Sequence, residues 1–379
     1  MKKSFAEILT DIGSDTLRKA GKKIPGWEGA RIPSALSLEQ CSSQAAAEYK
    51  CQVLKRFFSG GAASVCDLTC GLGVDSLAFS KSAAKVLSFE RLPLLAQAAR
   101  DNFSRFGADN IEVRCEEVTP ATVLPDCDVF YADPARRDGT GRKVFRLEDC
   151  SPDIRPLLPV MLRKSRLVML KLSPMADISL LSRDFDGKLK EVHVVSLHSE
   201  VKELLCILGI AGSEEYTVNV VELNDPQDVF SFRPDEEKGA LAEYASIAQP
   251  GQYLYEPCPG LLKSGAFHLT GERFGLKEAD RTTRLYLSDR AVCSPLFKTY
   301  IIEHVLPLSN AGIKETRILY PQASVSARNI PMSSDVLRSR LDIGESPDRH
   351  IFGCSVSGRR VLLLCRRLAE KMTRPEDMV

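Results

Sequence analysis

Between Asp67 and about Leu208, short β-rich runs alternate regularly with helical stretches. Runs of strand length and composition stand at Ala63–Leu68, Lys85–Phe89, Ile111–Arg114, Asp128–Ala132 and Leu167–Leu172. Between the second and third runs, Leu92–Phe106 carries apolar residues at helical spacing and is followed by Gly107, a typical C-terminal helix residue. Strands that alternate with helices predict an α/β fold with a doubly wound, Rossmann-like parallel sheet.

Three further β-rich runs follow, at Val192–Leu197, Leu204–Leu208 and Tyr216–Val221. The connections between them are too short for a crossover helix, so at least one pair of strands must be antiparallel. Such an antiparallel ending is more typical of methyltransferases than of dehydrogenases. The sequence leaves open which of these runs form the hairpin.

Outside this region, the sequence predicts smaller structural units toward each end of the chain. The first fifty residues are polar and helical, with a break at Lys22–Gly26. The stretch Asn224–Lys238 is rich in Asp, Glu and Pro and predicts a linker. Beyond it, Gly251–Ser288 and Thr316–Leu368 each mix short strand-like runs with a helix, which predicts small α+β modules.

Composition narrows the class of protein. No apolar run reaches the roughly 18 residues of a membrane span and the N-terminus carries no signal sequence, so we expect a soluble, cytoplasmic protein with no membrane partner. A net charge of +1 means that any nucleic acid must be bound by a local basic patch. The 12 cysteines lack the paired spacing of a zinc knuckle, so we expect no metal. Four of them lie in apolar runs and predict buried thiols, at Cys66, Cys115, Cys206 and Cys365.

The first strand runs into a glycine turn within Val65–Ser76, where Gly71 and Gly73 precede a helix. Such a turn lets a ligand approach the backbone closely, although a tight turn alone would also explain it. Ser76 replaces the third glycine of the dinucleotide fingerprint, and the acid Asp67 precedes the glycines. A pyrophosphate would be repelled by that carboxylate, whereas S-adenosylmethionine offers an ammonium and a sulfonium. The turn therefore favours S-adenosylmethionine as cofactor.

Acidic residues at the ends of the next strands are also suited to bind S-adenosylmethionine. Glu90 ends the second strand, where a carboxylate can accept hydrogen bonds from the two ribose hydroxyls. Glu117, after the third strand, is a candidate acceptor for the adenine amino group, with Glu116 as its neighbour. Asp75 is a candidate cofactor contact, and a helix cap is the alternative.

The fourth strand leads directly into Asp133-Pro134, which places a carboxylate and a rigid turn at the ligand-binding edge of the sheet. In methyltransferases of exocyclic amines, an acid or amide before proline accepts the amine hydrogens and aligns the nitrogen for in-line transfer. We therefore predict Asp133 and Pro134 as the catalytic residues. Ala135 and Arg136 stand where many such enzymes have proline and an aromatic residue. Arg136 and Arg137 are candidate RNA contacts, or else solvated turn residues.

Together these motifs resemble the bacterial class I methyltransferases that carry C-terminal ferredoxin-like and THUMP-like domains. The family usually has glycine where this chain has Cys70, and its helical N-terminal region is longer. The resemblance covers most of the chain through Glu39–Ser43, Tyr49-Lys50, Asp67–Asp75, Asp133–Asp138, Leu147–Cys150, Lys171–Met175, Tyr253–Glu256 and Arg328-Asn329.

The resemblance implies a helical region (1–50), a methyltransferase domain (51–223), a ferredoxin-like module (250–300) and a THUMP-like domain (311–379). In the segment before the core, Gln40 and Ser42 are candidate contacts to the methionine end of the cofactor, although helix capping would also explain the serines. THUMP domains bind tRNA, which implies an RNA partner, tRNA or rRNA. A basic face for phosphates would use Arg328, Arg338, Arg340, Arg349, Arg359, Arg360, Arg366 and Arg367.

The sequence thus predicts an S-adenosylmethionine-dependent methyltransferase that acts on an exocyclic base amine in RNA. One alternative is an RNA-binding protein that keeps the cofactor fold without turnover. Another is a methyltransferase of a small molecule or protein. The oligomeric state, the RNA and the methylated atom are left open.

Overall fold

The structure is a computed structural model that describes residues 14–58, 63–136, 147, 150–210, 215–224 and 229–368. The chain divides into two compact units. The first comprises residues up to Val195 together with Lys202–Thr217, and the second comprises Ser196–Val201 and the residues from Val218 onward. No described helix is long and apolar enough to cross a membrane.

The first unit is the predicted α/β fold. Its helices are α1 (Ser14–Lys23), α2 (Ala35–Gln40), α3 (Gln44–Phe57), α4 (Val74–Ser80), α5 (Pro93–Arg105), α6 (Ile154–Lys164) and α7 (Ile178–Asp184). Its strands are β1 (Ser64–Asp67), β2 (Lys85–Glu90), β3 (Ile111–Cys115), β4 (Val129–Ala132), β5 (Ala135–Arg136), β6 (Cys150–Ser151), β7 (Leu167–Leu172), β8 (Leu189–Leu197) and β9 (Glu200–Leu208).

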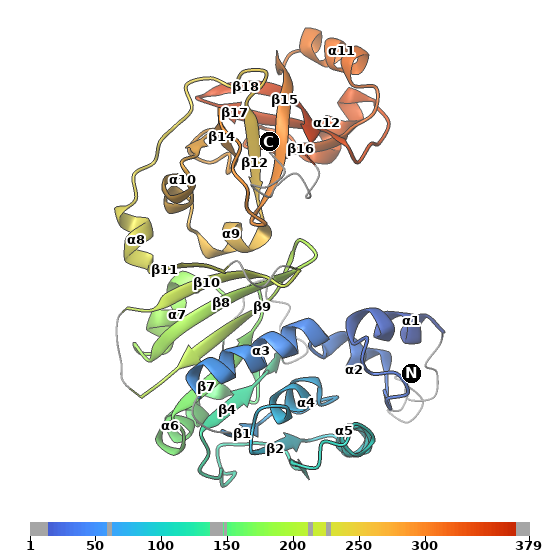
Figure 1. Cartoon of the computed structure of the whole chain (residues 1–379), viewed down its shortest axis with the longest axis vertical. Helices are drawn as coiled ribbons and strands as arrows, with labels where there is room; N and C mark the ends of the chain where they lie inside the picture. The colour runs from blue at the N-terminus through green and yellow to red at the C-terminus, as the bar shows by residue number, and fades with distance from the viewer. Residues whose placement is uncertain are drawn as a thin grey trace. The chain divides into compact units, whose positions relative to one another are not determined.

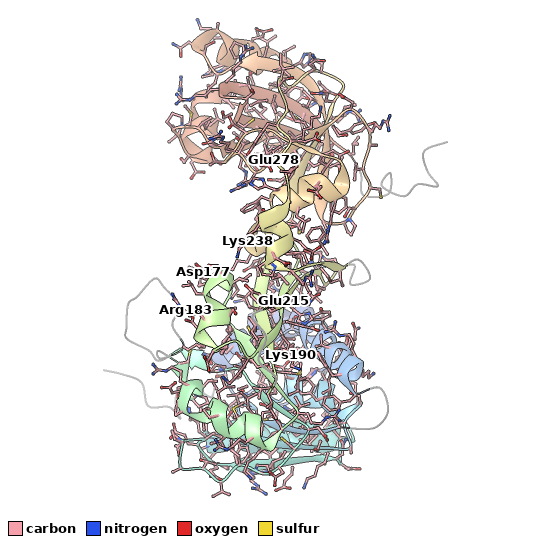
Figure 2. All side chains as sticks on the ribbon, turned by 90° about the vertical axis from the view of Figure 1, so that its left-hand side faces the viewer. Asp177, Arg183, Lys190, Glu215, Lys238 and Glu278 are labelled. Carbon is pink, nitrogen blue, oxygen red and sulfur yellow. The ribbon has the colours of Figure 1, made fainter. Side chains whose placement is uncertain are left out.

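The sheet of the first unit has the order β8-β9-β7-β4-β1-β2-β3 within the described residues. The strands from β7 to β3 are parallel, and β9 pairs antiparallel with β7, with Met169 opposite Ile207. Helices α3, α4 and α5 cover one face of the sheet and α6 and α7 the other (Figures 1 and 2). The doubly wound sheet and its antiparallel ending are therefore confirmed.

Local signals explain the boundaries of these helices. The hydroxyl of Ser43 accepts a hydrogen bond from the backbone of Ala46 and caps α3. Pro93 opens α5, and Gly107 follows it with a positive φ of 65°. On the opposite face, the carboxylate of Asp177 accepts from the backbone of Ser179 at the start of α7 (Figure 2).

The core of the first unit is centred on β4, whose four residues are fully buried. The ring of Phe79 on α4 meets that of Tyr131 edge-on, with centroids 5.2 Å apart. Cys66 and Cys206 are buried as predicted. The prediction is wrong for Cys115, which is exposed because it ends β3 at the edge of the sheet.

From Thr217 onward the chain is richer in strands. The helices are α8 (Pro234–Gly239), α9 (Pro259–Ser264), α10 (His268–Phe274), α11 (Asn310–Leu319) and α12 (Ser334–Leu341). The strands are β10 (Thr217–Glu222), β11 (Val229–Phe232), β12 (Tyr253–Pro257), β13 (Lys277–Glu278), β14 (Tyr286–Ser288), β15 (Phe297–Pro307), β16 (Ser324–Arg328), β17 (Arg349–Val356) and β18 (Arg359–Arg367).

The linker predicted at Asn224–Lys238 is wrong. Strand β11 lies within it and pairs antiparallel with β10, and α8 follows. Exposed and buried residues alternate along Val229–Phe232, as is typical of a strand with one buried face. Pro234 and three acids in the first turn favour helix α8. The prediction used only the Asp, Glu and Pro content of this stretch, and that content does not distinguish a linker from a short strand and helix.

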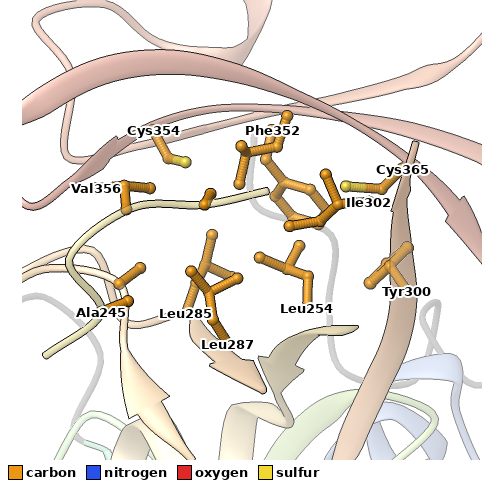
Figure 3. Close-up of a cluster of buried hydrophobic side chains, with 13 residues drawn as sticks. Ala245, Leu254, Leu285, Leu287, Tyr300, Ile302, Phe352, Cys354, Val356 and Cys365 are labelled. Atoms are coloured by element: carbon orange, nitrogen blue, oxygen red, sulfur yellow. The ribbon is translucent and has the colours of Figure 1, made fainter. Parts of the chain in front are cut away.

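The two C-terminal modules share one sheet, with the order β13-β14-β12-β15-β18-β17-β16. Strands β12 and β15 join them, with Leu254 opposite Tyr300. Figure 3 shows the resulting core, in which Leu254 and Leu287 point toward Phe352 and Val356 on the facing part of the sheet. The predicted α+β modules are confirmed, and they fold around a common core.

Candidate active site

A cavity of about 570 Å³ lies in the first unit at the carboxyl edge of its parallel strands. The residues that follow β1, β2, β3, β4 and β7 all contribute to its lining, as does the segment between α2 and α3. We name its two sides by their strands. The β2–β3 end is lined by Glu90, Glu116 and Glu117, and the β4–β7 end by Asp75, Asp133 and Lys171. This is the edge at which open α/β sheets bind ligands.

The glycine turn after β1 forms one wall of the cavity. Gly71 has a φ of 56° and Gly73 a φ of 86°, a backbone conformation that side chains disfavour. A Cβ atom on Gly73 would also lie 2.3 Å from Cζ of Phe103. Gly71 lines the cavity, whereas Gly73 starts α4 behind it. The turn therefore brings backbone close to any ligand in the cavity.

Asp67 lies beneath this turn and is absent from the cavity lining. Its carboxylate accepts hydrogen bonds from the backbone of Thr69 at 2.8 Å and from the hydroxyl of Ser76 at 2.5 Å. Burial raises the pKa of Asp67 to about 7, against the lowering effect of these hydrogen bonds. Ser76, where a dinucleotide fold has glycine, thus fixes the acid that shapes the turn.

Glu90 faces the cavity from the end of β2. Its carboxylate accepts one hydrogen bond from the backbone of Gly71 and another from that of Leu92, each at 2.8 Å. Each carboxylate oxygen has a second lone pair that a ligand hydroxyl can use. Glu117 also lines the cavity, with its side chain 60% exposed and 3.7 Å from Nη1 of Arg91. These acids place acceptors along the β2–β3 end.

The N-terminal segment closes the cavity on another side. Gln40, at the end of α2, and Ser42 both line it. The capping role that the sequence left open for the serines belongs to Ser43. Ser42 instead donates a hydrogen bond of 2.8 Å to Oδ2 of Asp75.

Asp75 is the centre of a buried polar network. It is not the helix cap, because Gly73 occupies that position of α4. Its carboxylate also accepts from Nζ of Lys50 at 2.9 Å and from the hydroxyl of Tyr131 at 2.8 Å. Burial raises the pKa of Asp75, but the charges of Lys50 and Lys171 together with the hydrogen bonds from Lys50 and Ser42 outweigh it, and the pKa is lowered overall. The sequence singled out Lys50 only as part of the resemblance and did not assign it a role.

Asp133 and Pro134 both line the cavity directly after β4. The backbone N–H of Asp133 donates to Oγ1 of Thr69 at 2.7 Å, which fixes the turn against the glycine loop. Nζ of Lys171, on β7, donates to Oδ2 of Asp133 at 2.5 Å. Burial lowers the pKa of Lys171, but Asp133 and the neighbouring acids outweigh it and raise the pKa. The pair fixes the carboxylate of Asp133 at the β4–β7 end.

The two predicted RNA contacts after this turn are only partly described. The backbone of Arg136 belongs to β5 and pairs with Cys150 of β6, while its side chain lies outside the described atoms. Arg137 lies outside the described residues. Among the described residues, no group of three or more His, Cys, Asp or Glu side chains is placed to hold a metal ion.

Comparison with known proteins agrees with this architecture. A ferredoxin-like domain family matches residues 253–294, and a THUMP-like domain family matches residues 297–367. No curated protein matches the sequence. Two solved structures overlap only part of the chain. A putative RNA methyltransferase from Pyrococcus horikoshii (17% identity, TM-score 0.28) covers 50% of this chain and 78% of its own. A putative methyltransferase from Streptococcus mutans in complex with S-adenosylhomocysteine (11% identity, TM-score 0.30) covers 41% of this chain and 95% of its own.

The crystal structure of a putative methyltransferase from Porphyromonas gingivalis W83 is similar over nearly the whole chain. The two sequences are 30% identical, and the match covers 97% of this chain and 95% of that one with a TM-score of 0.81. The chain therefore belongs to the family of bacterial class I S-adenosylmethionine-dependent methyltransferases with C-terminal ferredoxin-like and THUMP-like domains.

Proposed function

We propose that this chain transfers a methyl group from S-adenosylmethionine to an exocyclic amine of a base in RNA. The observation that carries the proposal is the Asp133-Pro134 turn, which Thr69 and Lys171 fix at the β4–β7 end of the cavity. A positioned carboxylate next to a cofactor-sized cavity is the arrangement that amine methylation needs.

The residues of the cavity fit the cofactor. Its volume of about 570 Å³ lies within the usual range for small-molecule sites. Glu90 would accept hydrogen bonds from the ribose hydroxyls, Glu117 from the adenine amino group, and Asp75 from the ammonium. Gln40 and Ser42 would close the methionine end, and the positive-φ turn at Gly71 would let the ligand approach the backbone. When bound, the cofactor supplies an electrophilic methyl group on a sulfonium.

The chain's own contribution to transfer is orientation. Lys171 occupies Oδ2 of Asp133, which leaves Oδ1 to accept one amine hydrogen while a backbone carbonyl of the turn accepts the other. These two acceptors would point the nitrogen lone pair at the methyl group, and such alignment is worth several kcal/mol of barrier. After methylation, the nitrogen loses one proton, which the carboxylate of Asp133 is placed to accept.

The second unit supports an RNA substrate. The THUMP-like match covers residues 297–367 and includes the eight arginines of the sequence analysis. Three of these arginines form ion pairs within the unit: Arg328 with Glu256, Arg338 with Glu345 and Arg366 with Glu303. Arg359 and Arg360 are exposed where β18 begins, and phosphate groups could reach them there.

Methyl transfer to RNA tests this function. Labelled S-adenosylmethionine is incubated with the protein and with RNA from cells that lack it, and the nucleosides are separated by mass spectrometry. We expect label in one N-methylated base, and at least about 100-fold less label with the Asp133→Ala variant. Label in a small metabolite or a protein would contradict the RNA substrate. No label anywhere, although cofactor binds, would contradict the enzyme and favour an RNA-binding protein.

A further inference from the structure

Beneath the cavity, Lys50 is completely buried between two acids. Its Nζ atom lies 2.9 Å from Oδ1 of Asp75 on α4 and 3.0 Å from Oε1 of Glu203 on β9. It also donates to the hydroxyl of Ser42 at 2.9 Å. Of the three charged residues, only Asp75 lines the cavity. The network therefore presents one fixed carboxylate to a ligand and keeps two charges out of its reach.

The orientation of Asp75 is set by donors from three separate segments. Oδ1 accepts from Lys50, and Oδ2 accepts from Ser42 and from Tyr131. A carboxylate has about four acceptor positions, so one position on Oδ1 remains for a ligand. Because Asp75 faces the cavity, a ligand that fills this position must be a donor.

The charges around Asp75 indicate that the hydrogen-bond donor of the ligand is a cation. Asp75 and Glu203 share the single ammonium of Lys50, which leaves one negative charge in excess. Nearby, Asp133 and Lys171 balance each other. Lys202 also lines the cavity, but its side chain is exposed, and exposed charges are screened more strongly than buried ones. An excess negative charge away from water is stabilised by a cation in the adjoining cavity.

We propose that Lys50 is a positioning residue that keeps Asp75 ionised and oriented to accept hydrogen bonds from the α-ammonium of the cofactor. The inference rests on the proposed function, because it presumes S-adenosylmethionine as the ligand. Glu203 sustains the position of Lys50 and supplies the excess negative charge. Ser42 carries the network to the N-terminal segment, so this segment closes over the same end of the ligand.

Two ligands separate this role from a structural one. S-adenosylhomocysteine carries the α-ammonium, whereas 5′-methylthioadenosine has the same adenosine and thioether without the amino-acid end. Calorimetry with both ligands is applied to the full-length protein and to Asp75→Asn. We expect the wild-type protein to bind S-adenosylhomocysteine more tightly by about tenfold or more, since the added bond is charge-assisted. In Asp75→Asn this advantage should disappear, with binding of 5′-methylthioadenosine unchanged.

The role of Lys50 itself is tested with Lys50→Met combined with Glu203→Gln, which avoids leaving two buried carboxylates without a cation. We expect about a tenfold loss of affinity for S-adenosylhomocysteine and less than a twofold change for 5′-methylthioadenosine. If the double variant does not fold, Glu203→Gln alone removes the excess charge. This single variant should lower the affinity for S-adenosylhomocysteine by a few fold and leave the affinity for 5′-methylthioadenosine unchanged. Glu48→Gln is the matched control, because Glu48 lies on α3 like Lys50 but has a partly exposed side chain, and it should change neither affinity.

Equal losses for both ligands, or no loss for either, would overturn the role of Lys50. A wild-type protein that binds the two ligands equally would overturn the ammonium contact while keeping the adenosine pocket. A wild-type protein that binds neither would overturn the proposed function itself.

Discussion

The two ends of the cavity fix their carboxylates in different ways. At the β2–β3 end, Glu90 accepts from backbone amides and Glu117 is largely exposed. At the β4–β7 end, Asp75 and Asp133 are each paired with a lysine from another segment. Backbone amides suit a neutral ligand part with hydroxyl donors, whereas paired charges suit a region where charge must be controlled. The chain therefore concentrates its paired charges at the β4–β7 end, where we propose that the methyl group is transferred.

The largest effect should come from the β4–β7 end. Asp133→Ala removes both the side-chain acceptor and the charge that pairs with Lys171, so the amine would be misaligned. We expect methyl transfer to RNA to fall at least about 100-fold with unchanged binding of S-adenosylhomocysteine. Single-turnover transfer and calorimetry measure the two quantities. A normal transfer rate would show that this end does not orient the acceptor.

Asp67 is completely buried, and no lysine of the described residues forms an ion pair with it, in contrast to Asp75. Its pKa is raised by burial to about 7, so the folded state binds a proton more tightly than the unfolded chain does. Its contribution to stability is therefore complete below about pH 4 and is lost as the pH rises to about 7. The free energy of unfolding of the wild-type protein, relative to Asp67→Asn, should fall by up to about 1.4 kcal/mol per pH unit in this window.

Urea unfolding of both proteins from pH 4 to pH 8 measures this difference. Asp67→Asn is a matched variant, because its side-chain carbonyl can still accept from the backbone of Thr69. A difference that stays constant with pH would show that Asp67 is ionised throughout. The contrast with the lysine-paired Asp75 would then fail.

At the β2–β3 end, Glu90→Gln should act on the part of the ligand that both test molecules share. The variant loses an acceptor for the ribose and for one backbone amide. We expect about a tenfold loss of affinity for S-adenosylhomocysteine and the same loss for 5′-methylthioadenosine. A loss confined to S-adenosylhomocysteine would exchange the assignments of the two ends.

The smallest effect should come from Glu117. Its side chain is 60% exposed, so a hydrogen bond to the adenine amino group competes with water. Glu117→Gln retains an acceptor, and we expect affinity for S-adenosylhomocysteine to change by less than about threefold. Calorimetry measures it under the same conditions. A tenfold loss would show that Glu117 is shielded from water when the ligand is bound.

The sequence predicted the parallel strands because apolar runs of strand length alternate with helical spacing. Glu90, Asp133 and Pro134 were singled out because each lies at the end of a strand or just after it, and the carboxyl ends of parallel strands meet at one edge. The same rule could not tell that Asp67 points beneath the glycine turn, since position along a strand does not fix which side faces the cavity.

The paired charges could not be predicted at all. Lys50 and Glu203 are separated by 153 residues, and Lys171 and Asp133 by 38. Such contacts depend on tertiary packing, which leaves no local pattern. Lys50 and Lys171 lie in segments that carried the family resemblance, Tyr49-Lys50 and Lys171–Met175. That resemblance was the only sign in the sequence that these two lysines matter.

Titration of the wild-type protein with S-adenosylhomocysteine is the decisive test of the cofactor site. We predict one binding site for each chain, occupied with the glycine turn and Glu90 on one side of the ligand and Asp75 on the other. A crystal structure of that complex should show the carboxylate of Glu90 at the ribose and that of Asp75 at the ammonium. Absence of binding, or a ligand placed outside this cavity, would contradict the account.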